Sequence, residues 1–185
     1  MDPRALIDIL QVAERLKDTT RHCYTKNGRK ESVAEHSWMA TLMAFFIRDE
    51  FPEADMDKVI RMCIIHDLGE AFTGDIPSFY KTKENEETEE NLLYGWVETL
   101  PDPYKTEMLD LYEEMAARET LEAKIYKAID NMEAVVQHNI SDLSTWIPTE
   151  YELNKTYGND KVQFSEYMKA VRAELLKDTL KKLGE

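Results

Sequence analysis

The chain has 185 residues, of which 43% are hydrophobic and 32% are charged, a composition typical of a folded globular domain rather than of a disordered segment. Its 37 acidic and 23 basic residues give a net charge of −14, which disfavours nucleic acid and anionic membrane surfaces as partners because both need a basic patch. A small phosphorylated substrate stays compatible with this charge if a metal ion or an arginine makes one pocket locally positive.

The cellular setting follows from what the sequence lacks. No run of about 18 apolar residues is present, so no membrane span is predicted. The first ten residues, MDPRALIDIL, lack the basic and then apolar pattern of a signal peptide. The two cysteines, Cys23 and Cys63, form neither a disulfide framework nor a Cys-x-x-Cys pair. We therefore expect a reduced, cytoplasmic protein.

The hydrophobic pattern is helical along the whole chain, and no window alternates with a period of two for long, which predicts an all-α fold. The charged run at 83–91 is typical of a solvated helix start. In chain order, helices are expected over residues 3–17, 32–50, 55–74, 83 onward, 103 onward, 120–138 and 164–183. The segment 141–157 is either a lid or a connector.

Several of these helices have recognisable start signals. Ser32 and Glu35 form a capping box, and Asp55 and Thr120 are typical N-cap residues. The pair at 102–103, Asp-Pro, predicts a cap followed by a proline at the first helical position. We expect a single domain over residues 1–185, with a core over about 5–140 and a C-terminal helix over about 162–183 packing on it.

The stretch CIIHDLGEAFTGDIPS at 63–78 places charged residues directly after an apolar helix. Charges at the end of a buried helix cost free energy unless something pairs with them. His66 and Asp67 are neighbours, and Glu70 follows one turn later on the same side. A histidine with carboxylates suits a divalent transition metal better than Mg²⁺, although a His-Asp pair alone is a weak signal.

Three segments together, ESVAEHS (31–37), IIHDLGEAFTGDIPS (64–78) and KAIDNMEA (127–134), resemble the HD-domain metal-dependent phosphohydrolases. The longer motifs, HD-x-x-E followed by T-G-D-x-P, are most similar to the 5′-deoxynucleotidase branch. The resemblance implies an all-α helical bundle that releases phosphate from 5′-(deoxy)nucleoside monophosphates. It also implies one divalent transition metal per chain (Mn²⁺, Co²⁺, Fe²⁺, Zn²⁺ or Ni²⁺) and a homodimer.

Carried over position by position, the resemblance assigns a role to each matching residue. The implied metal ligands are His36, His66, Asp67 and Asp130. Glu70 lies outside this ligand set and is assigned to proton transfer or to orienting a water, with Asp67 and Asp75 as further catalytic candidates. The segment Asp75, Ile76, Pro77 and Ser78 would border the substrate, and Arg21 would orient its phosphate.

The sequence departs from the family pattern beside this arginine. The characterised bacterial enzymes have a tryptophan there that is associated with choosing deoxyribose, whereas this chain reads Arg21-His22-Cys23-Tyr24. His22 is therefore a candidate for contacting a sugar hydroxyl, and selectivity for deoxyribose is open. Two other functions also stay open, an HD hydrolase acting on another phosphoester such as a cyclic nucleotide, and a non-catalytic nucleotide-binding regulator.

Overall fold

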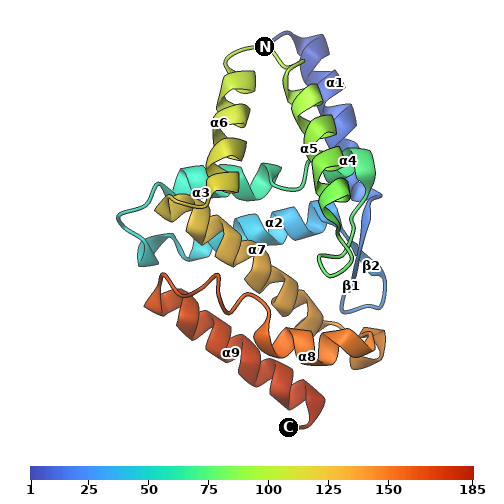
Figure 1. Cartoon of the computed structure of the whole chain (residues 1–185), viewed down its shortest axis with the longest axis vertical. Coiled ribbons are helices and arrows are strands. Elements are labelled where there is room, and N and C mark those ends of the chain that lie inside the picture. Colours follow the sequence, from blue (N-terminus) through green and yellow to red (C-terminus); the bar gives the residue numbers. More distant parts are fainter.

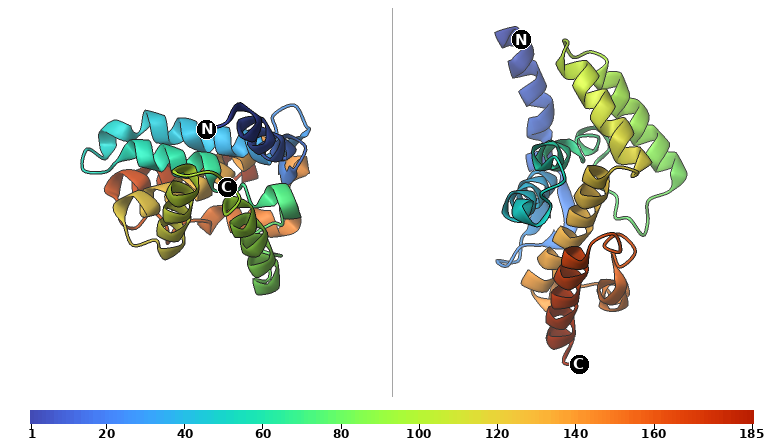
Figure 2. Two further views of the ribbon diagram at one scale, coloured as in Figure 1. Left: turned by 90° about the horizontal axis from the view of Figure 1, so that it is seen from above. Right: turned by 90° about the vertical axis from the view of Figure 1, so that its left-hand side faces the viewer.

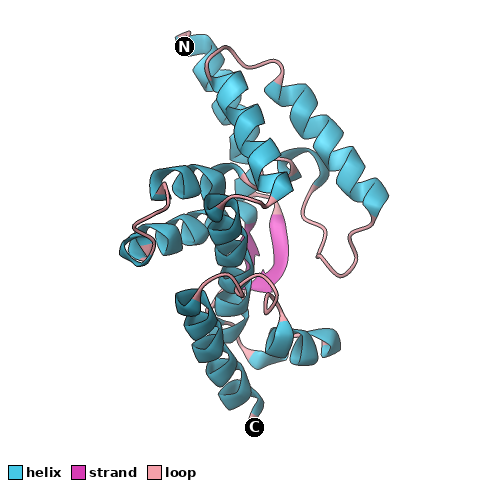
Figure 3. Ribbon diagram, turned by 60° about the vertical axis from the view of Figure 1, so that its left-hand side comes forward, coloured by secondary structure: helices cyan, strands magenta, loops and turns pink.

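A computed structural model describes residues 1–185 and confirms the all-α fold class, with one short β-hairpin in addition. The helices are α1 (Pro3–Glu14), α2 (Val33–Phe46), α3 (Met56–Ile65), α4 (Glu70–Thr73), α5 (Lys83–Val97), α6 (Tyr104–Ala117), α7 (Leu121–Ile140), α8 (Pro148–Thr156) and α9 (Glu166–Leu183). Short 3₁₀ turns occupy Arg15–Lys17, Arg48–Glu50 and Leu143–Thr145. The strands β1 (Thr20–Tyr24) and β2 (Lys30–Ser32) pair antiparallel, and Figure 3 shows them as the one strand pair among the helices.

Helix α7 forms the centre of the molecule. It packs against α2, α3, α6, α9 and β1, and most of its side chains are buried (Figure 1). Ile125, Ile129 and Met132 are among its fully buried side chains, and they join one continuous apolar cluster with residues of α2, α3, α5 and α6. This burial, rather than local helix propensity, supplies most of the stability of such a long helix.

The remaining helices extend away from this centre in two directions. Helices α5 and α6 form an antiparallel pair at one end, while α8 and α9 lie at the other, so the molecule is elongated and its termini lie at opposite ends (Figures 1 and 2). None of the helices combines the length and the apolar character that a membrane crossing requires.

The predicted helix starts are confirmed at three places. The Ser32 hydroxyl accepts from the Glu35 amide while the Glu35 carboxylate accepts from the Ser32 amide. The Asp55 carboxylate accepts from the Lys58 amide. The Thr120 hydroxyl accepts from the Ala123 amide at the start of α7. Each contact satisfies an amide that has no partner within its own helix.

Other expectations need correction. The predicted cap at Asp102 is wrong, because α6 begins at Tyr104, Pro103 is its N-cap residue, and the Asp102 carboxylate instead accepts from the Thr106 hydroxyl. The helix expected over 55–74 is interrupted between Ile65 and Glu70. The hairpin over 20–32 was not expected from a helical pattern.

Candidate active site

The four residues implied as metal ligands come together in the structure. His36 lies on α2, His66 caps the end of α3, Asp67 follows in the next turn, and Asp130 lies on α7. The Nε2 atom of His36 lies 3.1 Å from His66 Nε2, 3.1 Å from Asp130 Oδ1 and 3.6 Å from Asp67 Oδ2. His66 Nε2 lies 3.1 Å from Asp67 Oδ2 and 3.7 Å from Asp130 Oδ1. Two ring nitrogens and two carboxylate oxygens therefore surround one point.

The interruption after α3 explains how two consecutive residues reach this point. On a regular helix His66 and Asp67 would project about 100° apart. Instead, the backbone makes tighter bonds from Leu68 N to Ile65 O at 3.1 Å and from Glu70 N to Asp67 O at 3.0 Å. This irregular turn brings both side chains to the same side of the chain.

The outer nitrogens of both rings indicate what the site can hold. His66 Nδ1 donates to the Cys63 carbonyl at 2.9 Å, and His36 Nδ1 donates to the buried Glu133 carboxylate. In its neutral form, with the proton on Nδ1, each imidazole directs the lone pair of its Nε2 atom toward the point that the two carboxylate oxygens also face. The two Nε2 atoms and the two carboxylate oxygens are four electron-pair donors with no hydrogen between them, an arrangement that fits a cation. Hydrogen bonds from Nδ1 to a carboxylate or a carbonyl commonly orient histidines that bind a metal through Nε2. The donor set therefore fits a divalent transition metal.

Glu133 and Glu31 hold Arg21 beside this cluster. Arg21 Nη1 lies 3.1 Å from Glu31 Oε2 and 3.3 Å from Glu133 Oε2, and all three side chains are buried. Because both carboxylates face Nη1, the Nε and Nη2 groups of the guanidinium stay available to a ligand. Arg21 lines a cavity of about 480 Å³ that also reaches His36, His66 and Asp67. This volume suits a small ligand.

The other predicted site residues line the same cavity. They are His22, Glu70, Asp75, Ile76, Pro77, Ser78 and Asp130. Glu70 is buried at the start of α4, and its Oε2 has no hydrogen-bond partner. Burial, followed by the charges of Asp67 and Asp75, raises the pKa of Glu70 to about 10. Asp75 Oδ2 is also buried without a partner, and burial raises the pKa of Asp75. Two residues that line the cavity thus each have a buried carboxyl oxygen without a partner.

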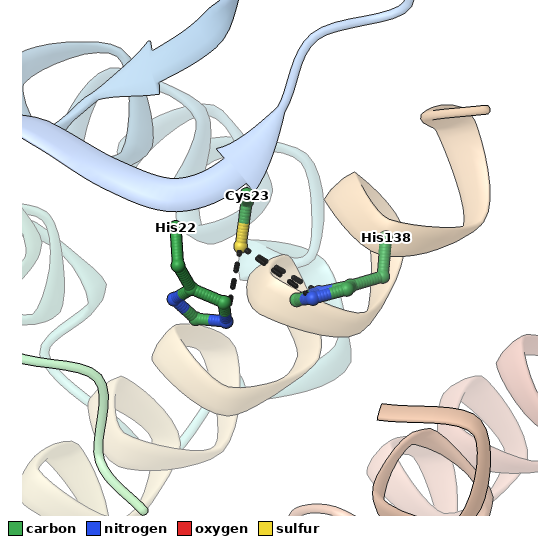
Figure 4. A group of neighbouring side chains, drawn as sticks. All are labelled: His22, Cys23 and His138. Atoms are coloured by element: carbon green, nitrogen blue, oxygen red, sulfur yellow. Dashed lines mark hydrogen bonds between the residues drawn. The ribbon is translucent and has the colours of Figure 1, made fainter. Parts of the chain in front are cut away.

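A second cluster borders the cavity and contains His22, Cys23 and His138 (Figure 4). His138 donates from Nδ1 to the Ala134 carbonyl at 2.8 Å, and its Nε2 lies 3.1 Å from Glu150 Oε1. With Nδ1 donating to a carbonyl and Nε2 beside a single carboxylate, His138 is placed to pair as an imidazolium with Glu150. Cys23 Sγ lies 3.6 Å from His138 Nδ1 and 3.8 Å from His138 Nε2, contacts that Figure 4 marks with dashed lines. The contact between His138 and Glu150 has the geometry of a buried ion pair.

The contacts within this second cluster favour the charged forms of His138 and Glu150. Burial opposes ionisation of His138, but its contacts with Cys23 and Glu150 raise its pKa to about 10. Burial would likewise raise the pKa of Glu150, but both histidines lower it to about 2. Glu150 Oε1 also lies 3.1 Å from His22 Nε2. One carboxylate of α8 therefore joins β1 and α7.

Sequence reasoning missed Glu31, Glu133, Lys127 and Glu150. Lys127 Nζ donates to Asp130 Oδ2 at 2.6 Å, on the side of Asp130 that faces away from the histidines. Lys127, Asp130 and Glu133 recur every three residues along α7, whose neighbouring side chains are buried and mostly apolar. Such a charged row on a buried helix was the signal that could have indicated Glu133.

The profile of the HD-domain family matches residues 13–172. The chain belongs to the HD-domain family. This HD domain is 30% identical over 138 residues to human 5′-deoxynucleotidase HDDC2, covering 72% of this chain and 67% of that protein. It is 26% identical to the Dictyostelium discoideum 5′-deoxynucleotidase HDDC2, covering 96% and 94% of the two chains.

Solved structures show the same fold. A predicted metal-dependent phosphohydrolase from Magnetospirillum magnetotacticum superposes on this HD domain with a TM-score of 0.82 at 24% identity, covering 97% of this chain and 95% of that one. A cyanophage S-2L HD phosphohydrolase, bound to dA and one catalytic Zn²⁺ ion, matches with a TM-score of 0.60 at 18% identity, covering 94% and 95% of the two chains.

Proposed function

We propose that the protein is a metal-dependent phosphohydrolase that releases phosphate from 5′-(deoxy)nucleoside monophosphates. The observation that carries the proposal is the convergence of His36, His66, Asp67 and Asp130 beside Arg21 in one cavity. The names of the HDDC2 relatives support a nucleotide substrate.

The metal would be held by His36, His66, Asp67 and Asp130, as one divalent transition ion per chain. When bound, such an ion supplies Lewis acidity, which polarises a phosphoryl oxygen and makes water more acidic. The buried Glu133 keeps the His36 proton on Nδ1, and the Cys63 carbonyl does the same for His66. Both Nε2 lone pairs are thereby kept for the ion.

The remaining residues handle the substrate. Arg21 binds the phosphate through its free N–H groups, which adds local positive charge in a chain whose net charge is −14. Glu70 transfers a proton to the leaving oxygen or orients the water, because it lines this cavity and its Oε2 has no partner within the protein. The segment 75–78 and His22 border the nucleoside.

The decisive experiment measures phosphate release from a panel of nucleotides with each divalent metal in turn. We expect turnover of 5′-nucleoside monophosphates that a chelator abolishes and a transition metal restores. Turnover of a cyclic nucleotide alone would support the other phosphoester class. Nucleotide binding without any release would identify a regulator instead.

Sugar selectivity is expected to be weak. His22 occupies the position after Arg21, where its ring meets Phe79 edge-on at a centroid distance of 5.4 Å and its Nε2 contacts Glu150. We expect kcat/KM for dAMP and dUMP to exceed that for AMP and UMP by about tenfold or less, because no tryptophan crowds the 2′ position. A preference above about a hundredfold would contradict this and indicate that Phe79 or Tyr24 forms the wall.

We also propose a homodimer. Helix α2 exposes three aromatic side chains, Trp38, Phe45 and Phe46, with Phe46 74% exposed, and exposed apolar patches of this kind commonly form interfaces. Light scattering should give twice the chain mass of 21.6 kDa, and Phe46→Glu should lower it. A wild-type monomer at micromolar concentration would contradict the proposal.

We also propose that the protein is cytoplasmic. Both cysteines are buried and free, as expected for a protein of a reducing compartment. A thiol reagent should therefore titrate both cysteines in protein unfolded without reductant. Fewer than two reactive thiols would contradict this location.

A further inference from the structure

Helix α8 is fixed against the cavity at both of its ends. Near its start, the Glu150 carboxylate lies between His22 and His138, at 3.1 Å from each ring. Near its end, the buried Arg172 of α9 donates to the backbone carbonyls of Asn154 and Tyr157, each at 2.9 Å. The helix is therefore anchored at both of its ends, and it forms one wall of the cavity.

One side chain of this wall has a buried polar atom without a partner. Asn154 is 3% exposed, lines the cavity, and its Nδ2 atom is buried without a hydrogen-bond partner. Leaving a buried donor unpaired is costly, and native proteins rarely do so without a ligand, water or functional reason. Since Arg172 donates to the Asn154 carbonyl, the backbone of this cavity-lining residue is held in place.

We infer that the side-chain amide of Asn154 binds the nucleobase of the substrate. The inference rests on the proposed function and names the group that contacts the part of the substrate beyond the phosphate. A neutral amide does not neutralise a phosphate, for which Arg21 is available. It offers one acceptor and two donors, and a 180° rotation exchanges them, so it can pair with the edge of any base. Asn154 therefore binds the base without strongly choosing among bases.

An internal partner for the amide is the competing explanation. Asn131 on α7 also has a buried Oδ1 without a partner. It lies close to the end of α8, because a Cβ added at Gly158 would lie 3.0 Å from Asn131 Cβ. The structure nevertheless contains no hydrogen bond between Asn131 and Asn154, and Asn131 does not line the cavity. Asn131→Ala is therefore the matched control.

The kinetic test compares wild type, Asn154→Ala and Asn131→Ala on dAMP, dGMP, dCMP, dUMP and the base-free 2-deoxyribose 5-phosphate. We expect Asn154→Ala to lose about tenfold in kcat/KM on all four nucleotides, mainly through KM, and less than about twofold on the base-free compound. Equal losses on nucleotides and the base-free compound would overturn the inference. So would a base-dependent loss of similar size in Asn131→Ala.

Two further measurements separate the remaining outcomes. With 2′,3′-dideoxy-AMP, which keeps the base but lacks the 3′-hydroxyl, the loss in Asn154→Ala should persist, and its disappearance would assign the amide to the hydroxyl instead. Asn154→Leu, of similar shape, should melt at or above the wild-type temperature, because it removes an unpaired buried polar group. A marked drop in melting temperature would show a structural bond and overturn the inference. A wild type inactive on every nucleotide would refute the proposed function itself, and the inference with it.

Discussion

Glu133 connects the two kinds of chemistry that the site combines. Its Oε2 atom faces both Arg21 Nη1, which we assign to phosphate, and His36 Nδ1, whose ring we assign to the metal. The side chain is fully buried, so no water replaces these contacts. A single carboxylate therefore sets the orientation of a cationic side chain and of an imidazole at once.

Replacing Glu133 by Gln tests this connection. We expect metal affinity to fall by about 10- to 100-fold, the usual effect of losing a group that orients a ligand, and KM to rise because Arg21 loses one of its two carboxylates. Calorimetric metal titration and steady-state kinetics at saturating metal measure the two effects separately. Asp142→Asn, at an exposed acidic residue in the turn after α7, should change neither value. A variant with normal metal affinity and KM would show that Glu133 only fills the core.

Glu70→Ala tests the proposed proton transfer. Because Glu70 stands outside the four-residue donor set, we expect metal and substrate affinity to stay close to wild type. The catalytic rate should fall by roughly 10²- to 10⁴-fold, the usual contribution of a general acid or base. Single-turnover rates and the metal content of the purified variant are the two measurements. Loss of the metal would identify Glu70 as a ligand and contradict its assignment.

Single residues of the site were predictable to different degrees. The sequence indicates a site at His66, Asp67 and Glu70, because these charged residues directly follow an apolar helix. Asp130 became a candidate only through the family resemblance, since an aspartate on an amphipathic helix usually faces solvent. Glu133 was missed for the same reason, because its partner His36 is 97 positions away and only the folded chain brings them together.

At the scale of elements, the predicted helix starts at Ser32, Asp55 and Thr120 were confirmed, whereas the cap at Asp102 and the irregular segments were not correctly predicted. The β-hairpin carried a recognisable signal, Asn27-Gly28, with Gly28 at a φ of 81°, but its second strand has only three residues. The helix is interrupted after Ile65 because His66 and Asp67 must both reach the candidate metal site. This requirement comes from the tertiary structure, and hydrophobic periodicity does not indicate it. The role of 141–157 was left open, and the structure places α8 there, fixed by Glu150 and Arg172.

The attachment of α8 should depend on pH. The pKa of Glu150 is lowered to about 2, so its contribution to stability is present above the unfolded value near 4.3 and is lost as pH falls toward 2. The pKa of His138 is raised to about 10, so its contribution is complete below the unfolded value near 6.5 and is lost as pH rises through 10. The pair therefore stabilises most between about pH 4.5 and 6.5.

Glu150→Gln should destabilise the protein by about 3 kcal/mol at pH 5.5, as expected for breaking a buried ion pair, and by clearly less at pH 10. Urea unfolding at both pH values measures the difference. Glu152→Gln, on the same helix with a side chain that is 81% exposed, should have little effect at either pH. A Glu150→Gln effect that does not change with pH would show that packing, and not charge, fixes α8.

At the scale of the whole molecule, the candidate metal site joins elements that would otherwise meet only through the apolar core. Its four side chains come from α2, the end of α3, the following turn and α7, which is the helix that most other elements contact. Without a cation, two carboxylates and two imidazoles lie together at contact distance, and Lys127 compensates only the outer oxygen of Asp130. A bound ion would therefore stabilise the packing of α2, α3 and α7 together.

We accordingly expect metal removal to lower the melting temperature of the whole chain. An ion that binds only the folded state stabilises it by about 2.7 kcal/mol at a concentration one hundred times its dissociation constant. For a chain of this length, that energy corresponds to a shift of about 5–10 °C. Thermal unfolding with a chelator, and then with Mn²⁺, Co²⁺ or Zn²⁺ restored, measures this shift.

The control is Asp130→Asn, which keeps every other acidic residue of this highly negative surface and so retains any loose cation binding. Its melting temperature should be the same with and without metal. A wild-type melting temperature that does not respond to metal, or a variant that responds as the wild type does, would place the cation elsewhere and remove the basis of the proposed reaction.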